Sequence, residues 1–160
     1  LGMVTVGLCA TGLKLGALRS WVIAGCLGSA AALIAIAMLG QAGPGAPLLP
    51  AVITLGYMNG VFAVAAIGSM MQLAGEGRDS REGTRMGLWG AAQAIAAGFG
   101  GLLGAAAADL LRHLVDSDAT AFGTVFLFEA ALFLVSGAIA LRVVDGPRPA
   151  SADPALVPGE

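Results

Sequence analysis

The fold is decided by residues 76–93, EGRDSREGTRMGLWGAAQ, in which a block of charge is followed directly by an apolar run. The block, residues 76–85, holds the densest charge in the chain and separates two apolar runs, 51–73 and 86–108. Each run has 23 residues without Asp, Glu, Lys, Arg or His. About 20 apolar residues in a helix cross a hydrocarbon core of about 30 Å. The pattern therefore predicts two membrane-spanning helices joined by a charged loop at the membrane surface.

The composition of the 160 residues favours the same class of protein. Hydrophobic residues make up 58% and charged residues only 11%, and the mean hydropathy is +0.88. These values are typical of an integral membrane protein whose partner is the lipid bilayer. The net charge of -2 argues against nucleic acid as a partner, because that would need a clustered basic face. Cys9 and Cys26 lie in apolar segments, so we expect them to pack as small hydrophobic residues without forming a disulfide.

The apolar runs predict an all-α membrane protein, a multi-span helical bundle that occupies residues 1–145. The first run, 1–13, is too short to cross a bilayer and predicts a truncated span. Complete spans are predicted at 21–39, 51–73, 86–108 and 122–141. Residues 40–50 contain three Pro and three Gly, which predicts a tight loop. The proline-rich residues 146–160 predict a disordered tail.

The basic residues are distributed unequally between the two sides of the predicted bundle. Seven Lys or Arg lie in the connectors at 14–20 and 74–85 and from residue 142 onward, whereas Arg112 is alone on the other side. The positive-inside rule therefore predicts a cytoplasmic C-terminus. The same alternation places the start of this chain outside. Because the chain begins at Leu1 and has an odd number of spans, we expect it to be a piece of a longer protein with further helices upstream.

Small residues recur every three or four positions along two predicted spans, which favours close helix packing in lipid. In the span 51–73 they are Gly56, Asn59, Gly60 and Ala63. In the span 86–108 they form what we call the small-residue stripe: Gly90, Gln93, Ala94, Ala97, Gly101, Gly104, Ala105 and Ala108. The amides of Asn59 and Gln93 should thus point into protein or a cavity. They are either interhelical hydrogen-bonding groups or ligand contacts.

Glu129 is the one acidic residue well inside a predicted span, about 10 Å from the outer end of its helix. An acidic side chain at the centre of a membrane helix costs about 2.5–3.5 kcal/mol, so it is usually protonated, paired or placed along a polar pathway. Glu129 is therefore a candidate ligand-binding or proton-carrying residue. A protonated Glu129 bonded to a neighbouring helix would satisfy the same energetics.

The remaining polar residues lie at the membrane surfaces. Arg78, Arg81, Glu82 and Arg85 either set the topology or contact anionic lipid or a partner protein. His113 is interpreted as a solvated loop residue, with an axial ligand of a chlorophyll magnesium or a protonation switch as the alternatives. The sequence contains no catalytic triad, phosphate-binding loop, paired metal-ligand cysteines or dinucleotide fingerprint. We therefore expect no enzyme, no catalytic residue, no catalytic cofactor and no metal site.

Three stretches resemble a known family. Residues 59–71, NGVFAVAAIGSMM, and 81–96, REGTRMGLWGAAQAIA, are similar to the C-terminal half of the PucC-type, or bacteriochlorophyll delivery, branch of the major facilitator superfamily. Residues 121–126, AFGTVF, together with Glu129 resemble the start of the last helix of that family. The resemblance covers roughly residues 51–143, and residues 1–50 match more loosely.

The resemblance implies the C-terminal part of a major-facilitator-type fold, with the spans as helices eight, truncated, to twelve. It also implies a multi-pass protein of the bacterial inner, photosynthetic intracytoplasmic membrane, with bacteriochlorophyll as bound ligand and antenna polypeptides as partners. The expected function is to bind or deliver bacteriochlorophyll and assist assembly of light-harvesting antenna complexes. The alternatives are a proton-coupled secondary transporter with Glu129 as the carrier, and a helical scaffold for partner helices. Without the N-terminal half, the chain alone would lack the central cavity of a transporter.

Overall fold

The structure is a computed structural model, and it describes residues 1–12, 17–43, 45–75 and 82–144. Helix α1 (Gly2–Val6) continues into a π-helical segment, η1 (Gly7–Gly12). Four long helices follow: α2 (Leu18–Gln41), α3 (Leu48–Gly75), α4 (Glu82–Leu114) and α5 (Asp118–Val144). The described residues contain no strand. This arrangement confirms the predicted all-α bundle.

All four long helices are long and apolar enough to cross a membrane, over Leu18–Gln41, Leu48–Gln72, Gly83–Leu114 and Asp118–Arg142. Each complete predicted span lies inside one of them. The helices extend beyond the predicted spans by several residues, since a charge-free run marks the hydrocarbon core and not the end of a helix. Helix α4, with 33 residues, is about 50 Å long and therefore exceeds the hydrocarbon thickness.

The connection between α2 and α3 forms the tight loop that its composition predicts. Gly43 adopts a left-handed conformation, with φ of 98°, which glycine tolerates without steric cost. Its carbonyl accepts a 3.1 Å hydrogen bond from the N–H of Ala46. Pro50 lies in the first turn of α3, where its missing N–H removes no helical hydrogen bond. The loop thus reverses the chain and makes α2 and α3 antiparallel.

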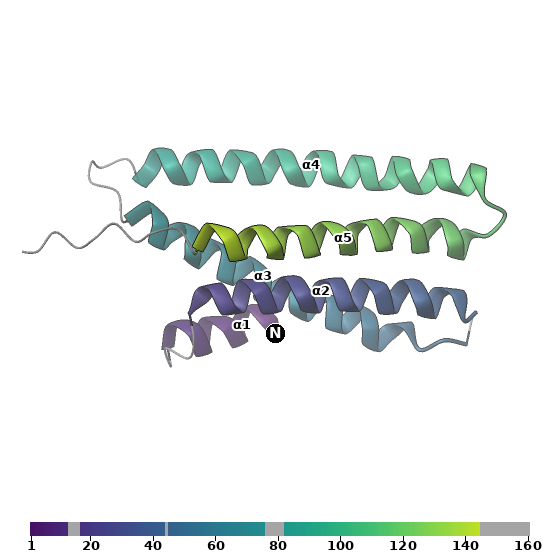
Figure 1. Cartoon of the computed structure of the whole chain (residues 1–160), viewed down its shortest axis with the longest axis horizontal. Helices are drawn as coiled ribbons and strands as arrows, with labels where there is room; N and C mark the ends of the chain where they lie inside the picture. The colour runs from purple at the N-terminus through teal and green to yellow at the C-terminus, as the bar shows by residue number, and fades with distance from the viewer. Residues whose placement is uncertain (13–16, 44, 76–81, 145–160) are drawn as a thin grey trace, which may run out of the picture.

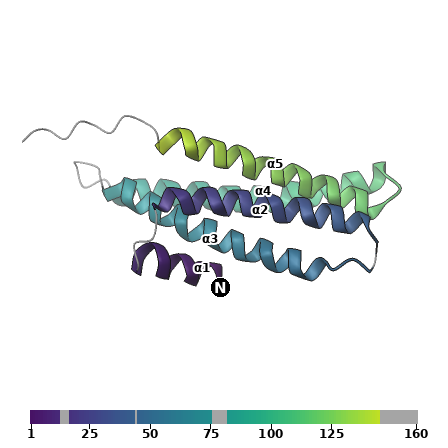
Figure 2. The same ribbon diagram turned by 60° about the horizontal axis from the view of Figure 1, so that its bottom comes forward.

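Helix α2 is the centre of the bundle and packs between α3 and α5 (Figures 1 and 2). One core cluster joins Ala30 and Leu33 of α2 to Ala130 of α5. Beside it, the rings of Phe62 on α3 and Phe133 on α5 meet edge to face at 6.0 Å. The three helices α2, α3 and α5 therefore form the tightly packed part of the described structure.

Close approach of helix backbones depends on glycine at Gly25. A Cβ atom added there would lie 2.7 Å from the backbone nitrogen of Phe62. Helix α1 packs on the outer side of α3, with Val6, Val61 and Ala65 forming a second core cluster. The N-terminus lies part-way along the length of the bundle (Figure 1).

Helix α4 is the least buried of the four long helices. In its most apolar 18-residue window only 6% of the residues are buried, compared with 44% for α2. Figure 1 shows α4 running along the outside of α5, to which it is joined by a short turn at one end. Its exposed side chains include Leu88, Ile95, Phe99 and Leu102. Lipid, or protein outside the described residues, must cover these side chains in the membrane.

Candidate functional site

A groove of about 620 Å³ lies between α4 and α5 and is called the α4–α5 groove below. Its lining is apolar except for one hydroxyl and one carboxyl group. Helix α4 contributes Gly100, Leu103, Gly104, Ala107 and Leu111, and helix α5 contributes Thr124, Val125, Phe128, Glu129 and Leu132. The groove therefore combines a large apolar surface with very few polar atoms, as ligand sites for apolar molecules do.

The groove exists because the α4 wall is smooth. A Cβ atom added at Gly100 or Gly104 would meet no side chain or neighbouring helix within 4 Å. Ala108, next to the lining residue Ala107, is buried. The small residues of α4 thus leave room in front of Phe128 and Leu132 that the side chains of the described residues do not fill.

Glu129 lies on the wall of the groove formed by α5. The next residue, Ala130, is 2% exposed and belongs to the core, against which Phe126 and Phe133 also pack. Because successive residues of a helix are rotated by about 100°, the carboxyl group is turned away from this core and into the groove. The structure thus places Glu129 among the residues that line the groove, and whether it bonds a helix outside the described residues stays a prediction.

Thr124 is the second polar residue of the groove. Its Oγ1 donates a 2.8 Å hydrogen bond to the carbonyl oxygen of Thr120, one turn earlier in α5. The hydroxyl hydrogen is therefore used within the helix. What Thr124 offers to the groove is an oxygen with free lone pairs.

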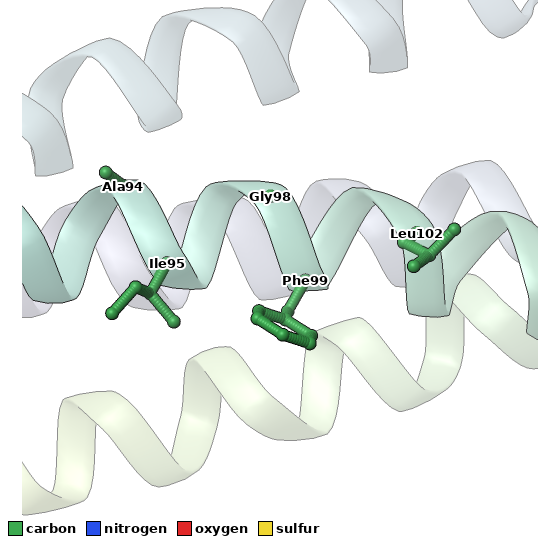
Figure 3. A pocket seen from close by; sticks show the side chains of 5 residues that line it. All are labelled: Ala94, Ile95, Gly98, Phe99 and Leu102. Carbon is green, nitrogen blue, oxygen red and sulfur yellow. The ribbon is translucent and has the colours of Figure 1, made fainter.

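A smaller hollow of about 390 Å³ lies on α4 and is lined by Ala94, Ile95, Gly98, Phe99 and Leu102. Figure 3 shows Ile95 and Phe99 pointing to one side of the helix and Ala94 to the other. This hollow is wholly apolar in its lining. Gln93 immediately precedes it on the same helix and is exposed.

Asn59 is part of an interhelical hydrogen bond. Its Oδ1 accepts a 2.9 Å bond from Oγ of Ser29 on α2, and Ser29 is completely buried. This geometry supports the interpretation of Asn59 as a group that joins helices. Asn59 is thus bonded to Ser29 rather than to Gln93, and the structure does not bring the two amides together. Their role as ligand contacts stays a prediction.

The small-residue stripe lies on α4, and the expectation that it packs against another helix is wrong for the described part of this chain. Ala108 is buried and Gly104 is half-buried, but the other six residues of the stripe are exposed. The expected small-residue face of α3 is confirmed at Gly60, which packs against Gly2 and Met3, and wrong at Gly56, which is exposed. Periodicity identified smooth faces correctly but not the partners that cover them.

The predicted charged block, residues 76–85, lies only in part within the described residues. Arg78 and Arg81 lie outside the described residues, as does the tail 146–160. Helix α4 begins at Glu82, and Arg85 is exposed in its first turn. The contacts proposed for these residues with a partner protein therefore remain predictions.

At the opposite end of α4 a polar cluster holds the turn to α5. The Nε of Arg112 donates to Oδ1 of Asp118 at 2.9 Å, and its guanidinium lies 5.8 Å from the centre of the Phe122 ring. Next to it, His113 is exposed as expected, but it lies in the last turn of α4 and not in a loop. The sequence alone suggested no contact for Arg112, which was used only to assign the two sides of the membrane. Its ion pair joins the two helices that form the groove.

Two hydrogen bonds join the ends of α2 and α5. A guanidinium nitrogen of Arg19 donates to the carbonyl oxygen of Leu141 at 3.1 Å. At the other end, Nε2 of Gln41 lies 3.5 Å from Oγ1 of Thr120. These contacts place Arg19 and Arg142 at the same end of the bundle and Arg112 at the other. The described basic residues are thus separated as the topology prediction requires.

The described residues include no group of three His, Cys, Asp or Glu side chains that could hold a metal ion. The sequence did not identify Thr124, Phe128 or the α4 wall of the groove as site residues. For two further lining residues a signal existed, because Val125 and Leu132 lie four and three residues from Glu129 and therefore share its face. The α4 wall could be found only from the pairing of α4 with α5.

Comparisons with known proteins agree with the resemblance in the sequence. A family model described as PUCC protein matches residues 1–147. A curated protein of Rhodobacter capsulatus named bacteriochlorophyll synthase 44.5 kDa chain is 65% identical over 159 residues, covering 99% of this chain. The chain spans only 36% of the length of that relative. No solved structure matches the chain. Because the family model covers nearly all of the sequence, the chain belongs to the PUCC protein family.

Proposed function

We propose that this chain is part of a multi-pass membrane protein that binds bacteriochlorophyll and delivers it to antenna polypeptides during assembly of light-harvesting complexes. Membership of the family and the printed name of the relative support a role connected with this pigment. The observation that carries the proposal is the α4–α5 groove. Its volume of about 620 Å³ falls within the range of roughly 300–1,000 Å³ that is typical of sites for small molecules and cofactors.

The position of the groove suits a ligand that is dissolved in the bilayer. Helix α4 lies on the outside of the bundle and exposes Leu103 and Leu110 beside the groove. A hydrophobic pigment can therefore reach the groove sideways from lipid, without passing through water.

The proposed role is binding and transfer and not a chemical conversion. The polar groups that line the groove are one carboxyl and one hydroxyl group, which suffice to orient a ligand. The word synthase in the name of the relative applies to that protein. We accordingly assign no reaction and no catalytic residue to this chain.

The remainder of the protein is proposed to complete a major-facilitator-type fold. The relative is nearly three times as long as this chain, so further helices are available to cover α1 and α4. We place the end that carries Arg19 and Arg142 at the cytoplasmic side of the inner, intracytoplasmic membrane. The segment with Arg81, Glu82 and Arg85 would then meet the polar ends of antenna polypeptides at this surface.

Glu129 supports a second candidate function, proton-coupled transport of a small solute. A carboxyl group that faces an otherwise apolar groove is the type of residue that carries protons in membrane transporters. In this case, solute addition to vesicles containing the full-length protein would move protons, and the purified protein would be colourless.

Filling the groove tests the proposal. In the full-length protein, Gly104→Phe places a ring in the α4–α5 groove, whereas Gly90→Phe places the same ring on α4 outside the residues that line it. We expect Gly104→Phe to reduce copurifying bacteriochlorophyll and assembled antenna, measured by absorption per inserted protein, and Gly90→Phe to leave both near the wild-type level. Equal pigment and antenna in the two variants would contradict the proposed function.

A further inference from the structure

The side-chain polar atoms of the α4–α5 groove are all oxygens. Thr124 offers lone pairs only, because its hydroxyl hydrogen is donated to the carbonyl of Thr120. Glu129 offers the two oxygens of its carboxyl group. The backbone N–H groups in this part of α5 are engaged in the helix. A ligand in the groove therefore meets electron-pair donors, provided that the carboxyl group is ionised.

The ionised form of Glu129 needs a partner. A carboxylate at the centre of a membrane helix costs about 2.5–3.5 kcal/mol, and the residues that line the groove include no Lys, Arg or His. The group that offsets the cost of the carboxylate must therefore belong to the ligand. An electropositive atom of the ligand, in contact with Glu129, is such a group.

The position of Glu129 suits the centre of a flat ligand. Along α5, Glu129 lies between the apolar residues Val125 and Leu132 of the lining, and its side chain is exposed to the groove. Thr124 is five residues away, about 7.5 Å along the helix axis, at one end of the lining. A metal ion bound to Glu129 would therefore be out of reach of Thr124.

The opposite wall has the shape that a planar ring requires. Gly100, Gly104 and Ala107 follow one another on α4 at steps of four and three residues, and an added Cβ at either glycine would have open space in front of it. A macrocycle can thus lie flat against α4 with one face turned to α5. The metal at its centre would then face the side that carries Glu129.

We propose that Glu129 is the axial ligand of the magnesium ion in the bound bacteriochlorophyll, an inference that rests on the proposed function. Magnesium prefers hard oxygen donors, and a carboxylate oxygen is one. On binding, one oxygen–magnesium bond forms and the previous axial ligand, a water molecule, leaves. This step is an exchange of ligands on magnesium, so no oxidation or reduction takes place.

The test compares two pigments that differ in the metal. Bacteriochlorophyll a and its metal-free derivative, bacteriopheophytin a, are titrated into the purified full-length protein, and each Kd is measured by fluorescence quenching. Wild-type protein is expected to bind the magnesium pigment more tightly. Glu129→Leu should raise the Kd of the magnesium pigment about tenfold and leave that of the metal-free pigment nearly unchanged. Glu129→His, which supplies another magnesium ligand, should restore the preference.

Thr124→Val is the matched control, because it removes the other side-chain oxygen of the groove. It should leave the ratio of the two Kd values as in the wild type. If Glu129→Leu weakens both pigments equally, or neither, Glu129 is not the magnesium ligand, although the groove still binds pigment. If wild-type protein binds neither pigment, the proposed function fails and this inference with it.

Discussion

Replacement of Gly25 by Ala tests the most specific packing contact of the structure. The added carbon would lie 2.7 Å from the backbone nitrogen of Phe62 and 2.8 Å from its Cα, whereas carbon atoms in contact prefer about 3.5–4.0 Å. Both atoms belong to the backbone, so no change of rotamer relieves the overlap. Helices α2 and α3 must therefore move apart at the centre of the bundle.

The magnitude follows from two opposing effects. Overpacking of a filled core costs about 1–3 kcal/mol, and a clash with backbone atoms belongs in the upper part of this range. Alanine improves helix propensity over glycine by about 0.8–1.0 kcal/mol. We expect Gly25→Ala to lower the free energy of unfolding by about 1–2 kcal/mol.

The matched control is Gly101→Ala, at which an added Cβ meets no neighbouring helix within 4 Å. Only the propensity effect remains there, so this variant should be as stable as the wild type or more stable by up to about 1 kcal/mol. Thermal unfolding of the full-length protein in detergent should show a lower melting temperature for Gly25→Ala alone. Equal losses in both variants would refute the assignment of Gly25 as the close contact.

Three further predictions concern topology and polar contacts. A cysteine introduced at Ser80, in a background without the two native cysteines, should react with an impermeant thiol reagent only after cells are opened; labelling of intact cells would reverse the proposed orientation. Ser29→Ala removes the bond to Asn59 and should lower stability by about 0.6–1.7 kcal/mol in thermal unfolding, whereas an unchanged melting temperature would mean that the bond contributes nothing. Arg112→Ala should cost at most about 1 kcal/mol, because its ion pair with Asp118 is exposed, and high salt should reduce the difference from wild type; a larger, salt-independent loss would show that the pair is not solvated.

Much of the fold was predictable because lipid imposes a strict rule on length and polarity. The run 86–108 lies inside α4, but the helix continues to Glu82 at one end and Leu114 at the other. Charged residues at these ends remain helical in the headgroup region, where helix formation needs no apolar side chains. Charge patterns therefore predict where helices cross lipid better than where they end.

The candidate site was predictable only in part. Glu129 could be selected from the sequence alone. An acidic residue within a membrane span is costly, so it is usually protonated, paired or placed along a polar pathway. The partner of Asn59 could not be predicted, since Ser29 is on another helix whose rotation is set by packing. The small-residue stripe identified a smooth surface, but in the structure Gly104 is its one member in the lining of the α4–α5 groove, and most of the stripe is exposed. Sequence periodicity does not predict which helix packs against which, because that pairing depends on the tertiary structure.

The most direct measurement of the central claim is a cryo-electron microscopy map of the full-length protein purified with its pigment. The account predicts planar density between α4 and α5, lying against Gly100 and Gly104, with its centre beside Glu129. Pigment density elsewhere in the protein, with the α4–α5 groove filled by helices from outside this chain, would contradict it.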